Sequence, residues 1–276
     1  MPLLLEKNNI CMHRSRCQKG TLAYRRLIPN RLGVFMHCRQ QCWFYASMER
    51  IIEPSHHHWD RQPHPALMNA IYLLACHFSQ LPRYTEFEAE FLVQAQWEIN
   101  VALDNSDRLV DVVQASSLLA IYLCLKDHGM EGYRHVFTAA RLAVGIGLHQ
   151  TLTLDIIPDV GHASTPVISI PPPCDSIELR DRIFAFWQVF MVDRFWSVAN
   201  GLPLALPERD NARCRILTPW PSGLAGPKLV GLILWVTIYL PCLLAFIRNP
   251  HWQARLLNCC SRNLRSQNRR NFTCLP

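Results

Sequence analysis

Thiolate and imidazole side chains near the N-terminus are the groups in this sequence best suited to holding a metal ion. Zinc sites in proteins use four such ligands, and the most specific sequence signal is a Cys-x-x-Cys pair. No such pair occurs anywhere in the chain. The spacing leaves open only an irregular four-ligand site, which would be built from Cys11, Cys17, Cys38 and Cys42, with His13 or His37. The run from His56 to His58, near His64, is more typical of an exposed loop than of a ligand set.

No group of residues has the spacing of a catalytic centre. Asp127, His128 and Glu131 lie close together at a predicted helix end, where a solvated turn explains them better than an acid/base site. Gly145 and Gly147 lack the third glycine of a dinucleotide-binding loop and close a helix instead of following a strand. Metalloprotease, phosphate-loop and nucleophile-elbow signatures are absent from the sequence. We therefore expect a non-catalytic chain with no cofactor of its own.

Helical periodicity dominates the middle of the chain. Residues 66–78 are apolar nearly all round, and Pro65 suits a first helical position, so this helix should lie at the centre of the fold. Thr85 and Glu88 form a predicted capping box for a second, amphipathic helix. That helix should bury a stripe from Phe87 to Leu103 and turn Glu88 toward water.

Two more helices are expected before residue 150. Asp107 is a predicted cap for a helix that runs to Lys126, and a further helix should extend from about Glu131 to Leu148. The small residues in the latter would let a neighbouring helix approach closely; they are Ala139, Ala140, Ala143, Gly145 and Gly147. Residues 150–174 are typical of a linker, and no segment alternates with the period of a strand. The predicted fold class is all-α, a multi-helix bundle of packed helix pairs.

The longest predicted helix runs from Asp175 to Asn200. Asp175 and Glu178 form a capping-box-like start, while Gly201 and Pro203 form a stop, because glycine reaches the left-handed conformation freely and proline cannot continue a helix. Its apolar face is wide enough to require several other helices around it. The face comprises Leu179, Ile183, Phe184, Phe186, Trp187, Phe190, Met191, Phe195, Trp196 and Val198.

Charged side chains interrupt this apolar helix at two places. Near its start lie Arg180, Asp181 and Arg182, and near its end lie Asp193 and Arg194. A charge in such a helix must reach solvent or find a partner. Two interpretations follow: weak ion pairs on the helix surface, or a partly buried Asp193/Arg194 pair that fixes the register of the helix.

Four blocks of residues between His64 and Asp210, taken in chain order, resemble the regulatory "middle homology" domain of fungal transcription factors. The resemblance covers about residues 61–221, and residues 39–52 faintly resemble the lead-in to the same domain. The first block is His64–Ile71, and the second is Gln114-Ala115 with Ser117–Ala120. The third comprises Glu131-Gly132, Ala139–Ala143 and Gly147–His149. The fourth comprises Arg180, Arg182, Ile183, Phe186, Trp187, Asp193, Arg194, Gly201, Pro203, Leu206, Pro207 and Asp210, with Thr218–Pro221 as a last trace.

This resemblance implies an all-α regulatory domain that takes part in transcription regulation in the nucleus. The motif positions to which it assigns a structural or regulatory role are Arg141, Gly147, Arg182, Trp187, Asp193, Arg194, Gly201 and Pro203. The implied partners are other transcription proteins or a second family subunit, and a small-molecule effector is also compatible with the family. Members bind DNA through a separate six-cysteine zinc cluster, which this chain does not contain.

Charge divides the chain into three parts. Residues 1–50 carry nine Lys and Arg against two Asp and Glu, residues 51–210 carry ten against nineteen, and residues 211–276 carry nine against none. An acidic middle is a poor partner for phosphate groups. Twelve cysteines and no secretory leader point to reduced thiols in the cytosol or nucleus. We expect a basic N-terminal segment over 1–60, the regulatory domain over 61–221 and a divergent tail over 222–276.

The tail supports an alternative function. Residues 229–247 are uncharged, are bracketed by Lys228 and Arg248, and are long enough to cross a bilayer. In this alternative the protein is a membrane-anchored helical interaction protein. A second explanation of the tail is that residues 222–276 arise from intron read-through or a shifted frame, which would account for a basic segment without a single acid.

Overall fold

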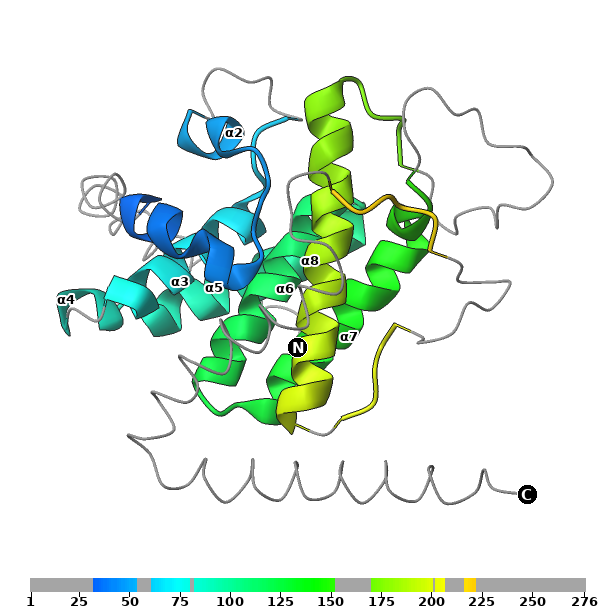
Figure 1. The fold of residues 1–276 in the computed structure, drawn as a ribbon. Coiled ribbons are helices and arrows are strands. Elements are labelled where there is room, and N and C mark those ends of the chain that lie inside the picture. Colours follow the sequence, from blue (N-terminus) through cyan, green and yellow to red (C-terminus); the bar gives the residue numbers. More distant parts are fainter. Residues whose placement is uncertain are drawn as a thin grey trace, which may run out of the picture.

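Every regular element in the described part of the chain is a helix (Figure 1). The computed structural model describes residues 32–53, 61–79, 82–151, 170–200, 202–206 and 216–221. No strand occurs within these ranges. The predicted all-α fold class, with helices packed in pairs, is therefore confirmed.

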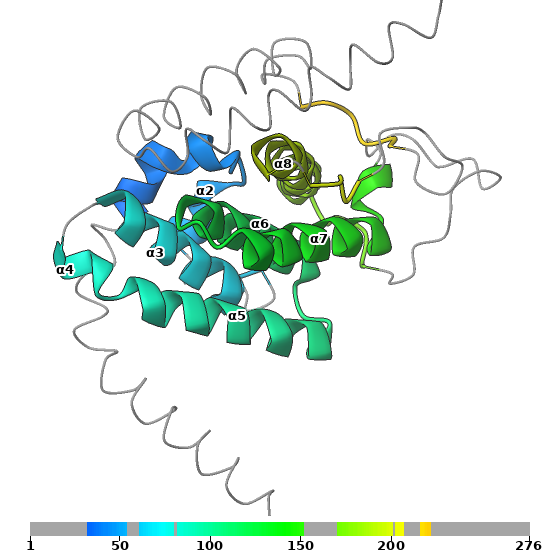
Figure 2. The same cartoon turned by 90° about the horizontal axis from the view of Figure 1, so that it is seen from below.

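Within the described ranges, seven α-helices and two short 3-10 helices follow a helical segment over residues 32–38. In chain order they are η1 (Arg39–Cys42), α2 (Met48–Ile52), α3 (Pro65–Ser79), α4 (Pro82–Thr85), α5 (Glu88–Asn105), α6 (Leu109–Leu125), α7 (Gly129–Gly145), η3 (Leu148–Gln150) and α8 (Ser176–Asn200). In Figure 2, α8 lies on one side of α6 and α7, and α5 lies on the other side.

Local capping signals placed two helix starts correctly. Helix α3 begins at Pro65, and its next residue, Ala66, donates its backbone N–H to Nδ1 of His64. Helix α8 follows Asp175, whose carboxylate accepts the N–H of Glu178 at 2.8 Å. The carboxylate of Glu178 in turn accepts the N–H of Cys174 at 3.0 Å. These are reciprocal contacts of the kind that satisfy the unpaired donors of a first turn.

The capping box predicted at Thr85 and Glu88 is wrong. The Thr85 hydroxyl donates to the carbonyl of Pro82, and no side chain caps α5. Glu88, predicted to face water, is only 4% exposed. Its carboxylate accepts hydrogen bonds from the Tyr122 hydroxyl at 2.9 Å and from the Lys126 ammonium at 2.7 Å. The Glu88 carboxylate therefore binds side chains at the end of α6 instead of capping the start of its own helix.

The cap predicted at Asp107 is wrong as well. Helix α6 is preceded by Arg108, which has a left-handed φ of 41° and no side-chain cap. The Asp107 carboxylate instead binds the Arg108 guanidinium, with Oδ2 and an arginine nitrogen 2.8 Å apart. The guanidinium also donates to the carbonyl of Gln62. The pair of Asp107 and Arg108 thus connects the α5–α6 turn to the residues before α3. The Asp107 carboxylate is used in this tertiary contact and does not cap α6.

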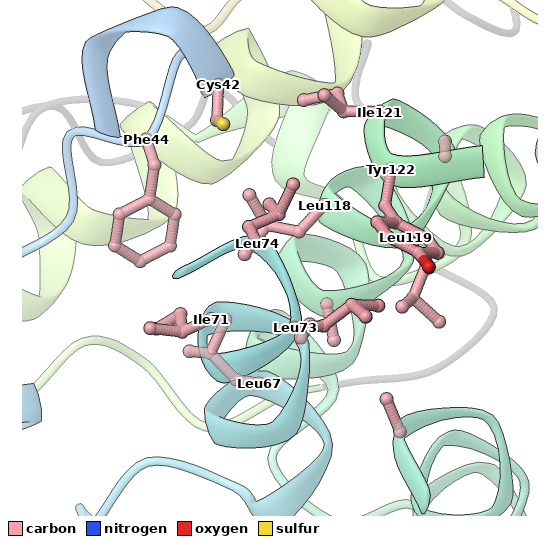
Figure 3. Close-up of a cluster of buried hydrophobic side chains, with 14 of the residues drawn as sticks. Cys42, Phe44, Leu67, Ile71, Leu73, Leu74, Leu118, Leu119, Ile121 and Tyr122 are labelled. Carbon is pink, nitrogen blue, oxygen red and sulfur yellow. The ribbon is translucent and has the colours of Figure 1, made fainter. Parts of the chain in front are cut away.

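Two groups of buried apolar side chains make up the core, and α6 contributes to both. The first lies among α3, α5, α6 and the second half of α8, and it includes apolar side chains of the segment from Phe35 to Ile51, of which Phe35 and Phe44 are fully buried. In Figure 3, Leu74 of α3 and Leu118 of α6 lie at the centre of this group, with Phe44 on the left and Cys42 above them. The second group lies among α6, α7 and α8.

At Gly132, the backbone of α7 lies directly against the ring of Trp196 of α8. A Cβ atom placed there would lie 2.3 Å from Cζ2 of Trp196, which is far inside van der Waals contact. A Cβ atom at Gly145 would meet nothing within 4 Å. The small residues predicted to allow close packing therefore differ in their surroundings. Ala139, Ala140 and Ala143 are buried in the core group shared with α8, whereas Gly145 faces open space. Gly132, which was not among the predicted residues, lies against Trp196.

Candidate functional site

The family motif near the end of α8 forms a buried clamp on the turn that follows the helix. Asp193 is 1% exposed, and its two carboxylate oxygens accept the backbone N–H groups of Ala205 at 2.8 Å and Leu206 at 3.0 Å. Ala205 and Leu206 are themselves buried in the second core group. The carboxylate thus satisfies two donors that would otherwise be costly to bury.

Two further side chains hold the same turn. The Arg194 guanidinium donates to the Asp193 carboxylate and to the carbonyl of Leu206, both at 3.1 Å, and it lies 4.4 Å from the ring centroid of Phe190. From α7, the Tyr133 hydroxyl donates to the carbonyl of Pro203 at 3.1 Å. We call residues 202–206 with Tyr133, Asp193 and Arg194 the turn clamp. It links α7 and α8 through the backbone of a segment that has no helix of its own.

The electrostatics of the clamp favour a tightly held carboxylate. Burial raises the pKa of Asp193 above its ordinary value. The N–H groups of Ala205 and Leu206 oppose that rise, as do the positive charges of Arg194 and Arg141. Arg141 is exposed on α7, with its guanidinium 4.9 Å from the ring centroid of Phe137. Arg141 therefore acts on the clamp through its charge.

Gly147 positions a second junction, between η3 and residues 216–221. Its φ of 80° lies in the left-handed region that glycine adopts without strain, and η3 begins directly after it. The carbonyl of His149 then accepts the N–H groups of Leu217 at 2.8 Å and Thr218 at 3.1 Å. The Thr218 hydroxyl donates to the Leu148 carbonyl and accepts the N–H of Thr151. These contacts fix residues 216–221 against the end of α7.

Trp187 secures the same segment from α8. Its indole N–H donates to the carbonyl of Pro219 at 2.7 Å, and its ring packs against Trp220 with centroids 4.5 Å apart. Phe190 also packs against Trp187, with ring centroids 5.1 Å apart. The motif residues Trp187 and Asp193 thus do similar work, because each uses its polar atoms to hold main-chain groups that follow α8.

The first half of α8 is tied to residues 42–50 by polar contacts that the sequence did not reveal. Asp181 accepts the backbone N–H of Ser47 at 2.9 Å, and Gln188 donates to the carbonyl of Cys42 at 3.1 Å. Arg50 donates to Asp111 of α6 at 2.6 Å. All three pairs are far apart in the sequence. The signal that could have drawn attention to them was the presence of polar residues in otherwise apolar helical stretches.

The remaining motif residues occupy different places. Arg182 is buried and donates to Glu178 one turn earlier in α8, with N and O 2.5 Å apart. Pro203 is exposed at the start of the clamped turn. Gly201 lies outside the described residues, as do Pro207 and Asp210. The structure therefore brings Asp193, Arg194 and Pro203 together and places Arg182 at the opposite end of α8.

Asp127, His128 and Glu131 lie at an exposed junction between α6 and α7. The His128 imidazole and the Glu131 carboxylate come within 3.5 Å of each other, and both side chains are open to solvent. Glu131 also accepts a hydrogen bond from Gln96 of α5 at 2.6 Å. The site has the properties of a solvated turn that also bridges two helices.

Metal binding can be examined for part of the candidate ligand set. Within the described ranges, no three His, Cys, Asp or Glu side chains are arranged so that they could hold a metal ion. Cys42 is buried in the first core group, where burial raises the pKa of its thiol. Cys11, Cys17 and His56–His58 lie outside the described residues. So does the apolar run 229–247, and none of the described helices is long and apolar enough to cross a membrane.

One comparison with known proteins identifies a family. Residues 43–219 match the profile of the "Fungal specific transcription factor domain". The match includes all of α3 to α8, and its first residues are those that α6 and α8 hold through Ser47 and Arg50. No curated protein and no solved structure matches the chain significantly.

Proposed function

Because the chain belongs to the fungal specific transcription factor domain family, we propose that it acts as a non-catalytic regulatory domain in the control of transcription. The observation that carries this proposal is the family match over residues 43–219. The turn clamp supports this proposal, since the charged groups of the motif residues bind backbone atoms inside the domain. A group committed in this way serves to set the shape of a surface and is not free to act on a substrate.

The clamp offers a route by which a signal could alter the domain. A ligand or partner that pulls on the turn after α8 acts on α8 through Asp193 and on α7 through Tyr133. Releasing the turn leaves two buried N–H groups without their acceptor, which costs about 1–3 kcal/mol for each group. We propose that a regulatory input acts by shifting the turn between a held and a released state.

Other parts of the proposal follow from the family. The chain would act in the nucleus, with other transcription proteins or a second family subunit as partners and with a small-molecule effector as a further input. It would reach DNA through a zinc cluster carried by another module, for which the present sequence supplies no six-cysteine pattern.

A reporter assay tests the regulatory role. The full chain is fused to an unrelated DNA-binding module in fungal cells, and transcription from the matching promoter is measured. We expect transcription to change relative to the module alone. The Asp193→Asn variant should alter this effect, while Glu49→Gln, a change at an exposed site on α2, should not. Full-length, folded fusion protein that leaves transcription unaltered would overturn the proposal.

The apolar run at 229–247 keeps a second candidate function open, that of a membrane-anchored interaction protein. Tagged copies of the full chain and of a chain ending at Pro221 distinguish the two. Recovery of both copies in the soluble nuclear fraction supports the regulatory role. If the full chain alone stays with the membranes and resists extraction, the membrane-anchored function replaces it.

A further inference from the structure

Helices α5 and α7 each expose a ridge that nothing in the described part of the fold covers. Eight large apolar side chains are well exposed in that part, and the only two aromatic ones among them are Trp97 on α5 and Phe137 on α7. Val93 and Met130 lie on the same two helices and are 60% and 73% exposed. Exposed aromatic and methionine side chains are enriched where proteins bind one another.

The two ridges lie side by side. Gln96 of α5 donates to Glu131 of α7 at 2.6 Å, and the same amide nitrogen lies 3.5 Å from Nε2 of His135. Both helices begin near the C-terminal end of α6, since Glu88 binds Tyr122 and Lys126 there and α7 starts shortly after α6 ends. They therefore run in the same direction, with one exposed ridge on each side of the Gln96–Glu131 bridge. We call the two ridges together the α5–α7 face.

The ridges carry opposite charge. Helix α5 contains no Lys or Arg, and its ridge ends in the exposed carboxylate of Asp104. The ridge of α7 carries the exposed guanidinium groups of Arg134 and Arg141. A face with one acidic and one basic side is complementary to its own copy turned by two-fold symmetry.

Four exposed positions on each helix share one spacing. They are 93, 97, 100 and 104 on α5, where 89, 90 and 105 are exposed as well, and 130, 134, 137 and 141 on α7. Trp97 is next to Gln96, and Arg134 is next to His135, so these two side chains lie at about the same height along the bundle. Asp104 and Arg141 each lie seven residues further on, which is two helical turns.

We infer that the α5–α7 face binds the same face of a second copy of this chain, as a two-fold dimer. With the axis along the groove between the two helices, α5 of each copy lies over α7 of the other. Val93 then meets Met130, Trp97 meets the guanidinium of Arg134, and Asp104 meets Arg141. Each contact occurs twice. Aromatic, methionine and arginine side chains at the centre and ion pairs toward the rim are the composition expected of a protein interface.

This inference gives a binding surface to the second family subunit of the proposed function, and the association that it predicts does not depend on a role in transcription. Sedimentation velocity of the full chain over a range of concentrations should show a reversible equilibrium between monomer and dimer. Raising the salt concentration should weaken the dimer, because rim charges are screened. A chain that stays monomeric at every concentration overturns the inference.

Charge reversal tests the register. Asp104→Arg gives a copy with two basic ridges, and Arg141→Asp removes the positive end of the α7 ridge. Each variant alone should dimerise at least about tenfold more weakly than the wild type. Mixed together they should form a heterodimer with nearly wild-type affinity, because both sides of the interface become complementary again. A variant that had simply failed to fold could not be restored by mixing. Weakening without restoration, or no weakening at all, overturns the two-fold arrangement.

An apolar pair of variants gives an independent check. Trp97→Ser should weaken the dimer by at least about tenfold, as expected for an aromatic anchor at an interface centre. Ile177→Ser, which removes a similarly exposed apolar side chain from the first turn of α8, should leave it unchanged. The reverse result would place the interface elsewhere and overturn the inference.

Discussion

Helices α8 and α5 use their polar residues in opposite ways. Helix α8 buries Asp181, Gln188 and Asp193, and each of them binds a main-chain group of a segment outside the helix. Helix α5 buries one acid, Glu88, leaves Glu98 half-buried and exposes Glu90 and Asp104. The contrast indicates that α8 organises the irregular parts of the domain, whereas the exposed acids of α5 bind no main-chain group of another described segment.

The largest expected effect concerns the turn clamp. Asp193→Ala leaves the buried N–H groups of Ala205 and Leu206 without an acceptor and removes a partner of Arg194. We expect the free energy of unfolding to fall by about 3–5 kcal/mol, the cost of breaking a buried pair by removing one member. Chemical denaturation measures it. Asp104→Ala on α5 is the control and should change stability by less than about 0.5 kcal/mol. Equal losses in both variants would remove the distinction between the helices.

Acid should weaken the contact between α5 and α7. Burial lowers the pKa of His135 from 6.5 to about 4, so the folded state holds this proton less tightly than the unfolded state. The stabilisation is therefore complete above pH 6.5 and is lost as pH falls toward 4. Relative to His135→Gln, the wild type should lose up to about 3 kcal/mol of unfolding free energy over this window. Denaturation curves of both proteins at pH 7 and pH 4 measure the difference, and a constant gap would contradict a buried neutral imidazole.

Two glycines on α7 should respond oppositely to the same change. Gly132→Ala forces a methyl group into the ring of Trp196 and should cost about 1–3 kcal/mol through overpacking. Gly145→Ala enters open space and should be neutral or stabilise the helix by roughly 0.5–1 kcal/mol. Thermal denaturation of the two variants gives the comparison. If both variants lose stability, the contact between Gly132 and the ring of Trp196 is not the reason that alanine is unfavourable at position 132.

The smallest expected change in stability lies on the α5–α7 face. Trp97 is half exposed, so Trp97→Ala should cost less than about 1 kcal/mol. Phe91, on the buried side of the same helix, is 1% exposed, and Phe91→Ala should cost about 3–5 kcal/mol. Denaturation at a low protein concentration, where the chain is monomeric, separates folding from association. A large loss at Trp97 under these conditions would give this residue a structural role and weaken the case for an interface.

Prediction from the sequence succeeded where a contact joins residues within one turn. The starts at Pro65 and at Asp175 with Glu178 were read correctly because donor and acceptor are neighbours in the chain. The caps at Glu88 and Asp107 were not, because both carboxylates bind other groups in the folded chain. The motif residues Asp193 and Trp187 could be named from the sequence. The N–H groups that donate to Asp193 and the carbonyl that accepts from Trp187, all of them after α8, could not.

The sequence by itself determined the helices, their apolar faces and the family to which the chain belongs, since all three depend on residue types at fixed spacing. Only the tertiary structure decided what the charged side chains do. Ser47 and Asp181 are 134 residues apart, and Arg50 and Asp111 are 61 apart, yet each pair is in contact. A charge that must be buried goes to whichever partner the packed helices bring within about 3 Å, and helical periodicity carries no information about that choice.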